Sequence, residues 1–241
     1  MKTDQPIYQF LAMGAEAFRV LTGGLTLPGS YRFVSPTLKA LERRIDGVFE
    51  PDGHDAPVYL VEFQGQYLKT AWYNLMAKVA LYSEAHPDSE VRGILIFLHS
   101  SLDPCHSKGS AKEHAGGLLQ AVYLDHFLPD WLKREPDNPY LAVLAPLVLE
   151  SEFLRQKAPE LWQTIQQAPV APEVRESLSE ILAFWFFEHF KSLTKKEIWT
   201  MLNVLTPLQE TRAYQEIFAE GSAAGEAKGE ARGEEIGRAH V

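Results

Sequence analysis

Two carboxylates and one amide in the first third of the chain have residue types and a spacing suited to metal chemistry. Asp46, Glu62 and Gln64 lie in two segments rich in β-forming residues, at 44–49 and 58–64. Because side chains alternate along a strand, Glu62 and Gln64 share one face of the second segment. If the two segments pair as an antiparallel hairpin, Asp46 lies near Glu62, with Gln64 beside them.

Asp46 and Glu62 would conflict electrostatically if they lie side by side on a sheet. Two like charges repel each other, and burial from water makes the repulsion stronger. A bound cation would relieve it. Oxygen ligands with several water positions suit Mg²⁺ or Mn²⁺, and such an ion can activate water and neutralise a phosphate under attack. The pattern therefore favours a divalent-metal site for phosphoester chemistry.

Asp46 and Glu62 also have purely structural interpretations. Asp46 and Gly47 together form a hairpin-turn sequence, although the stronger turn signal that follows would leave almost no strand between the two turns. Glu62 could also simply form an ion pair with Arg43 or Arg44.

The segments around these residues predict an α/β fold with a mixed sheet flanked by helices. The strands at 44–49 and 58–64 are separated by a cluster of turn-forming residues, so we expect them to form a hairpin. A later segment, 92–99, is continuously apolar, as in a strand that is covered on both faces. In chain order, the expected elements are a helix over 7–21, strands over 31–34, 44–49 and 58–64, a helix over 67–86, a strand over 92–99, a loop over 103–117 and a strand over 120–124.

After about Pro139 the pattern predicts helices only. The aromatic run at 184–187, with Phe190, is apolar around most of a helix, so we expect it to be buried in this chain or against a second copy. The expected helices are 140–157, 160–167, 173–190, 195–205 and one that begins at 209. Glycine at every fourth position from 221 to 237 predicts a mobile tail, and the last six residues match a translated sequencing adapter and are expected not to be native.

The composition excludes several classes of protein. The chain has 241 residues, of which 46% are hydrophobic and 23% charged, as in an ordinary globular protein. With 23 Lys and Arg against 32 Asp and Glu, the net charge of −9 excludes a protein that coats nucleic acid through bulk charge. A single cysteine, no apolar leader segment and no apolar run of about 20 residues predict a cytoplasmic protein without a membrane span.

The two strand segments also carry a family signature. The stretches RIDGVFEP at 44–51 and PVYLVEFQGQ at 57–66 resemble the RxDGvF…PvyxvExQ signature of the Rpn-like family, a group of recombination-promoting nucleases and transposases. That family belongs to the PD-(D/E)XK nuclease superfamily, and the resemblance covers about the first 130 residues. It implies a restriction-endonuclease-like core, DNA as the substrate and Mg²⁺ or Mn²⁺ as the cofactor.

The resemblance assigns roles to single residues. It implies Asp46, Glu62 and Phe63 as metal ligands and Gln64 as the residue that orients the attacking water. Glu16, on the opening helix, would be a further ligand, although a solvated helix residue is the more ordinary interpretation. Gln64 stands where most of the superfamily has a lysine, and a neutral amide cannot act as a cation.

A lysine from another element would have to take over the cationic role. Lys39 and Lys69 are the two candidates, and Lys39 belongs to the predicted catalytic set. Lys39, Arg43 and Arg44 precede Asp46 and are expected to contact DNA phosphates, because the overall charge is unfavourable for DNA binding.

Together these observations predict a PD-(D/E)XK-like α/β domain over 1–135, a helical region over 136–220 and a tail over 221–241. The expected function is Mg²⁺-dependent endonucleolytic hydrolysis of DNA, linked to recombination or mobile elements. The alternative is a non-catalytic module that keeps the fold, binds DNA or protein, and forms a homo-oligomer through its C-terminal helices. A third alternative is a metal-dependent phosphoesterase that acts on a smaller substrate.

Overall fold

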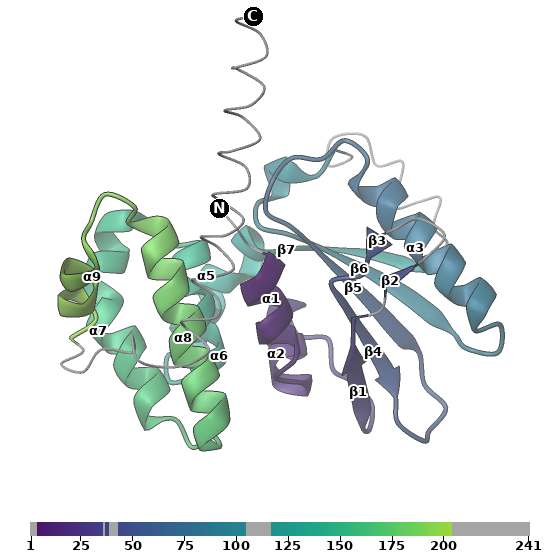
Figure 1. Ribbon diagram of the computed structural model, residues 1–241, viewed down its shortest axis with the longest axis horizontal. Helices are drawn as coiled ribbons and strands as arrows, with labels where there is room; N and C mark the ends of the chain where they lie inside the picture. The colour runs from purple at the N-terminus through teal and green to yellow at the C-terminus, as the bar shows by residue number, and fades with distance from the viewer. Residues whose placement is uncertain (1–3, 36, 39–42, 105–116, 204–241) are drawn as a thin grey trace, which may run out of the picture.

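The computed structural model of the chain describes residues 4–35, 37–38, 43–104 and 117–203. They form a five-stranded mixed sheet with helices on both faces, followed along the chain by a group of packed helices (Figure 1). The predicted α/β fold with a mixed sheet flanked by helices is therefore confirmed.

The strands of the sheet follow the order β1-β4-β5-β6-β7. β1 (Tyr31–Val34), β4 (Gly47–Pro51) and β5 (Val58–Gln64) are antiparallel neighbours, which confirms the predicted hairpin. β6 (Val91–Phe97) and β7 (Leu119–Tyr123) continue the sheet in parallel to β5. The carboxyl ends of β5, β6 and β7 therefore lie at one edge of the sheet, and the start of β4 lies at the same edge.

A separate two-stranded ribbon precedes β4. Its strands, β2 (Thr37–Leu38) and β3 (Arg43–Arg44), pair antiparallel, and β2 lies against α3 (Ala71–Ala85). The predicted strand that contains Asp46 is thus interrupted at 45–46, so Asp46 lies between β3 and β4.

Alternation along β5 divides the interior into two cores. Val58 and Leu60 belong to a cluster with α3, whereas Val61 belongs to a cluster with α1 (Asp4–Leu11) and α2 (Ala15–Leu21). Because successive side chains of a strand point to opposite faces, the same strand can bury apolar residues against both layers of helices. Glu62 falls on the α3 face of the sheet, with Val58 and Leu60.

Gly93 allows α3 to lie close to the sheet. A Cβ atom at this position of β6 would lie 2.6 Å from Cδ2 of Leu119 and 2.9 Å from Cγ2 of Val79, closer than real Cβ contacts allow. The glycine therefore leaves room for side chains of α3 and β7 that pack closely over β6.

The second part of the structure consists of helices that pack on one another and on α1 and α2. The bounds of these helices are α5 (Leu124–Arg134), α6 (Pro139–Leu144), α7 (Ser151–Gln167), α8 (Pro172–His189) and α9 (Lys195–Met201), with short 3₁₀ turns at η1 (Ser100–Leu102) and η2 (Ala145–Leu147). Within the described ranges, no helix has both the length and the apolar character needed to span a bilayer.

Several helices differ from the predicted ones. The opening helix divides into α1 and α2, because Gly14 adopts a φ of +94° between them. The helix that follows β5 begins only at Ala71, and α5 follows β7 directly where no helix was predicted. The helix from 209 and the tail at 221–241 lie outside the described residues, as does most of the predicted loop at 103–117.

The helix α7 continues through Pro159, where two separate helices were predicted. Its buried side is one continuous stripe, formed by Leu154, Ala158, Leu161 and Ile165. Packing of this stripe offsets the cost of the proline, about 3 kcal/mol in a helix interior. The chain instead breaks its helical path earlier, at η2, which contains Pro146.

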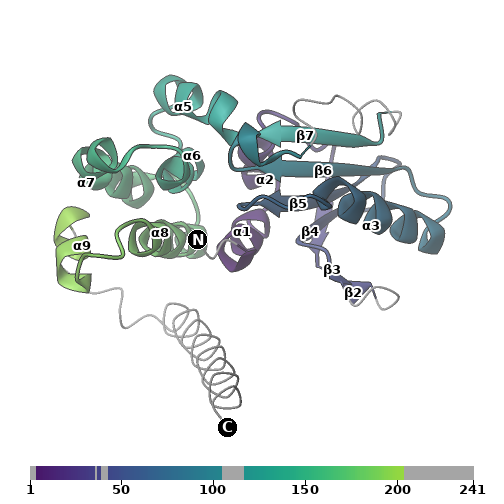
Figure 2. The same ribbon diagram turned by 90° about the horizontal axis from the view of Figure 1, so that it is seen from above.

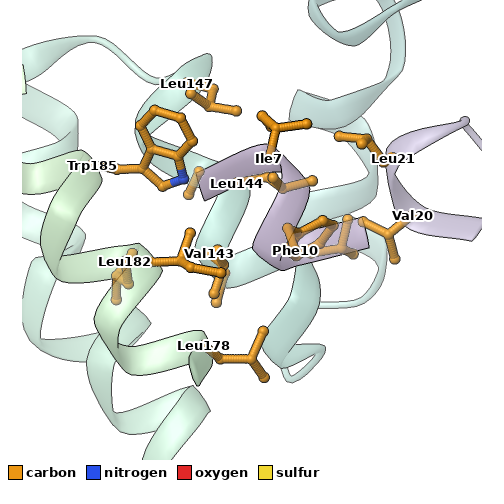
Figure 3. Close-up of a cluster of buried hydrophobic side chains, with 14 of the residues drawn as sticks. Ile7, Phe10, Val20, Leu21, Val143, Leu144, Leu147, Leu178, Leu182 and Trp185 are labelled. Carbon is orange, nitrogen blue, oxygen red and sulfur yellow. The ribbon is translucent and has the colours of Figure 1, made fainter. Parts of the chain in front are cut away.

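One hydrophobic core joins the sheet to the helical region through α1 and α2. Figure 3 shows Ile7 and Phe10 of α1 close to Leu144 of α6 and Trp185 of α8. Trp185 and Phe186 are fully buried, and Phe184 and Phe187 are half-buried against the same core, so the aromatic run of α8 packs within this chain. In Figure 2, α3 runs along the sheet, while the helical region lies beyond α1 and α2 at the other end of the molecule.

Candidate active site

The hairpin register places Asp46 opposite Glu62. Gly47 of β4 pairs with Val61 of β5. Asp46 precedes Gly47 and Glu62 follows Val61, so in an antiparallel pair the two acidic residues are the next to face each other. The main-chain N–H of Asp46 donates to Oε1 of Glu62 at 3.2 Å, and the N–H of Phe63 donates to Oδ2 of Asp46 at 3.0 Å. At the end of the β4–β5 pairing, these two main-chain N–H groups thus donate to side-chain carboxylates instead of main-chain carbonyls. Gly47 belongs to the paired strand, which excludes a hairpin turn at Asp46.

Lys78 of α3 reaches the same place from the helix that covers this face. Its Nζ lies 2.6 Å from Oε2 of Glu62, and both side chains are only 8% exposed. We refer to Asp46, Glu62 and Lys78 as the charged cluster. It stands at the sheet edge formed by the start of β4 and the end of β5.

Burial dominates the electrostatics of the charged cluster. Glu62 is buried, Lys78 contacts it, and Asp46 adjoins it. Burial, and after it the nearby charge of Asp46, raise the pKa of Glu62 to about 7, although Lys78 acts in the opposite direction. Burial and the carboxylate of Asp46 together disfavour the ionised form of Glu62 more strongly than Lys78 favours it.

Lys78 was not identified from the sequence. The signal that could have found it is its position in α3, where the buried positions include Ala71, Leu75, Lys78 and Tyr82. A lysine within an otherwise apolar helical stripe is rarely buried unless a negative group receives it. Strand patterns alone could not show which negative group that is.

Gln64 and Phe63 complete the predicted motif on β5. Gln64 is half-buried and follows Glu62 on the same face of the strand, and its carbonyl accepts a hydrogen bond from the N–H of Leu98 at 3.1 Å. The side chain of Phe63 packs in the core on the opposite face. Because the N–H and C=O of one strand residue point to the same side, the carbonyl of Phe63 lies on the Asp46 side of β5. Only this backbone oxygen could act as a ligand.

Among the described side chains, none of the cations predicted from the sequence is shown in contact with Glu62. Lys39 lies outside the described residues, and for Arg43 and Arg44 the structure describes only the backbone, as β3. Lys69 is exposed just before α3. The cation that contacts Glu62 is Lys78 rather than Lys69, because the side chain at 78 faces the sheet.

Glu16 takes part in a different cluster. It accepts hydrogen bonds from Arg19 at 2.7 and 2.8 Å and from Asn138 at 3.1 Å, and Arg19 also pairs with Glu135. The Arg19 guanidinium holds the pKa of Glu16 below its ordinary value. Glu16 therefore links α2 to the start of α6 instead of joining the charged cluster.

Polar contacts on either side of Lys78 hold α3 in place. The indole N–H of Trp72, in the first turn, donates to Asp103 at 2.8 Å, and Asp103 also accepts from the hydroxyl of Tyr123 at 2.6 Å. Near the other end of α3, the hydroxyl of Tyr82 donates to Glu50 of β4. These contacts set the rotation of the helix that directs Lys78 toward Glu62.

The donor set at this edge is small. In the part of the chain that the structure describes, no group of three or more His, Cys, Asp and Glu side chains could hold a metal ion. Two carboxylates and the neighbouring backbone are what the cluster offers a cation, which suits an ion that keeps several waters.

The fold and the site together define an α/β protein in which two acidic residues and a lysine meet at one edge of a mixed sheet. A family model with the description "Protein of unknown function (DUF2887)" matches residues 3–202, and the chain belongs to this family. The match runs from α1 to α9, so the sheet and the helical region are parts of one family unit. No curated protein and no solved structure matches the chain.

Proposed function

We propose that this protein is a Mg²⁺- or Mn²⁺-dependent deoxyribonuclease with a PD-(D/E)XK core, similar to the Rpn-like nucleases. The observation that carries the proposal is the charged cluster, in which Asp46 and Glu62 adjoin each other and Lys78 contacts Glu62. An aspartate, a second acidic residue and a lysine are the residue types of that superfamily's motifs. Here the lysine comes from α3 rather than from the position of Gln64.

The donor set fits a divalent cation with hard oxygen ligands. When both are ionised, Asp46 and Glu62 bring two negative charges to the site, and Lys78 contacts Glu62. Mg²⁺ in proteins is held by one or two carboxylates and keeps water in its remaining positions. The backbone of Phe63 adjoins Asp46 and offers a further oxygen. A cation bound here would supply the Lewis acidity that activates water and offsets phosphate charge.

Lys78 and Gln64 act on charge and on water. The Lys78 ammonium lies against Glu62 in a buried site, where it stabilises negative charge that develops on the phosphate during attack. The amide of Gln64 follows Glu62 on the same strand face and orients the attacking water by hydrogen bonding. The two residues divide the tasks that a lysine at the position of Gln64 would perform.

Cations that precede Asp46 in the chain supply the contacts to DNA. Arg43 and Arg44 form β3, which directly precedes the cluster, and Lys39 is a few residues earlier in the sequence. The protein carries a net charge of −9, so affinity depends on such local contacts and falls with salt.

Plasmid cleavage by the purified full chain tests this proposal. We expect supercoiled plasmid to be nicked in Mg²⁺ or Mn²⁺ and to stay intact in EDTA. Asp46→Asn and Lys78→Met should each lower the rate by about a hundredfold or more, because each removes a group that acts on the transition-state charge. Thermal melting of each variant shows whether it remains folded.

Glu84→Gln is the matched control for the plasmid experiment. Glu84 is a carboxylate on α3, the helix that carries Lys78, but it is exposed and lies outside the charged cluster. This variant should keep its cleavage rate. An intact plasmid with the wild-type chain, or equal rates for wild type and Asp46→Asn, would contradict the nuclease and favour a non-catalytic module.

A further inference from the structure

The segment that leads from β5 into α3 exposes large apolar side chains. Tyr67 and Tyr73 are 61% and 67% exposed, and Leu68 and Met76 are exposed as well. Elsewhere in the described ranges, only two large apolar side chains are exposed to a comparable extent. We refer to these four residues, together with Lys69, as the α3 patch. Concentration of exposed apolar side chains in so short a stretch marks an interaction surface.

The α3 patch lies in a stretch without negative charge. Between Glu62 and Glu84 the only charged residues are Lys69 and Lys78. The chain as a whole has 32 acidic against 23 basic residues, so this stretch departs from its overall balance. Lys78 is buried against Glu62, whereas Lys69 is exposed, two residues after Tyr67 in the sequence. The patch is therefore complementary to a partner that combines negative charge with flat apolar groups.

The α3 patch begins beside the charged cluster. Tyr67 follows Gln64 by three residues, on the chain that leaves the end of β5. The buried positions of α3 face the sheet, so Tyr73 and Met76 project from its outer side. A polymer held at the cluster can continue over the start of α3 and onto this outer side.

We infer that the α3 patch binds a DNA strand whose bases are unpaired and leads it to the charged cluster. Tyr67 and Tyr73 supply rings on which exposed bases stack, and Lys69 contacts the strand's phosphates. Bases in a duplex already stack on one another and offer no free face to such side chains. The inference rests on the proposed function for DNA as the ligand. It adds that the protein prefers single-stranded DNA to duplex DNA.

Fluorescence anisotropy with the full chain in EDTA measures this binding without cleavage. The probes are a fluorescein-labelled single strand of mixed sequence and the duplex of the same sequence. We expect the single strand to bind more tightly, and Tyr73→Ala to weaken its binding about tenfold through loss of one stacking platform. Tyr73→Phe keeps the ring and should keep the affinity. Lys69→Gln should lower the slope of log affinity against log salt by about 1.

Phe153→Ala is the matched control, since Phe153 is an exposed aromatic residue on α7, far from the patch in sequence. It should bind the single strand as the wild type does. Equal or tighter binding of the duplex, or unchanged binding by Tyr73→Ala, would overturn the inference. So would a dimer, seen by light scattering, that Tyr73→Ala dissociates, because the patch would then be an interface between copies.

Binding and cleavage separate this inference from the proposed function. If the single strand binds in a Tyr73-dependent way while no DNA is cut in Mg²⁺ or Mn²⁺, the nuclease proposal fails and the binding surface stands. If plasmid is cut but Tyr73→Ala changes neither binding nor cleavage, the nuclease proposal stands and the α3 patch is not a DNA site.

Discussion

Lys78 compensates part of the negative charge that Asp46 and Glu62 bring into the sheet. Removing one partner of a buried ion pair leaves an uncompensated charge and typically costs about 3 to 5 kcal/mol. Lys78 therefore contributes to stability as well as to the proposed chemistry. Because Lys78 comes from α3, a cationic group lies next to Glu62 even though β5 has a neutral glutamine at position 64.

The pH dependence of stability tests the environment of Glu62. Its pKa in the folded protein is about 7, above the ordinary value of 4.5, so folding favours the protonated form. Its contribution to stability is complete below the ordinary pKa and is lost as the pH rises through the folded-state value. We expect the unfolding free energy of the metal-free chain to fall between about pH 5 and about pH 8, and Glu62→Gln to remove most of that fall.

Urea denaturation in EDTA across this pH range measures the effect. Glu84→Gln, at an exposed glutamate of α3, should retain the wild-type slope. If wild type and Glu62→Gln change in parallel with pH, Glu62 does not have a raised pKa.

The orientation of α3 depends on polar anchors as much as on its apolar stripe. Asp103 accepts hydrogen bonds from Trp72 of α3 and from Tyr123 of β7, and it is itself buried. It thus ties the first turn of α3 to the carboxyl edge of the sheet. Lys78 lies further along the same helix, so any rotation of α3 moves its ammonium group away from Glu62.

Asp103→Ala should loosen α3. Removal of the carboxylate takes this acceptor from Trp72 and Tyr123, and a buried donor without its acceptor costs about 1 to 3 kcal/mol. We expect a loss of stability in that range and faster hydrogen–deuterium exchange of α3 amides, with α8 amides affected only through the global loss. Asp130→Ala, at an exposed position of α5, should leave exchange unchanged. Unaltered exchange in α3 of Asp103→Ala would show that the anchor does not hold the helix.

The sheet and the helical region share one hydrophobic core, with α1 and α2 between them. The family match covers both parts, from residue 3 to residue 202. Apolar contacts that cross from one part to the other give cooperative unfolding, because neither part can expose its side of the core alone. The helical region therefore stabilises the sheet that carries the proposed site.

A cavity in the shared core should destabilise both parts together. Leu144 is fully buried in α6, near Ile7 and Trp185 (Figure 3). We expect Leu144→Ala to lower the unfolding free energy by about 3 kcal/mol. Hydrogen exchange should show the same loss of protection in β5 and in α8. Leu118→Ala, at an exposed position, is the control, and separate unfolding of the sheet and the helices would contradict a single core.

Short-range patterns were enough to place the two carboxylates. Alternation along β5 and the turn residues that precede it are properties of neighbouring positions, so Asp46 and Glu62 could be set opposite each other from the residues alone. Helix α5, and the continuity of α7 where two helices were predicted, could not be predicted in the same way. Each contains a proline, Pro129 or Pro159, and is helical because its apolar side packs against other helices.

The order of the predicted elements indicated the α/β class, and the residues at 44–64 indicated the hairpin and its acidic pair. The resemblance to the Rpn-like family implied that a lysine is replaced at Gln64. The folded chain alone shows that Lys78 contacts Glu62. The rotation of α3 about its axis depends on its packing against β5 and β6, including its close approach at Gly93, and on anchors such as Asp103. Those contacts join residues far apart in the chain, and no local pattern carries their geometry.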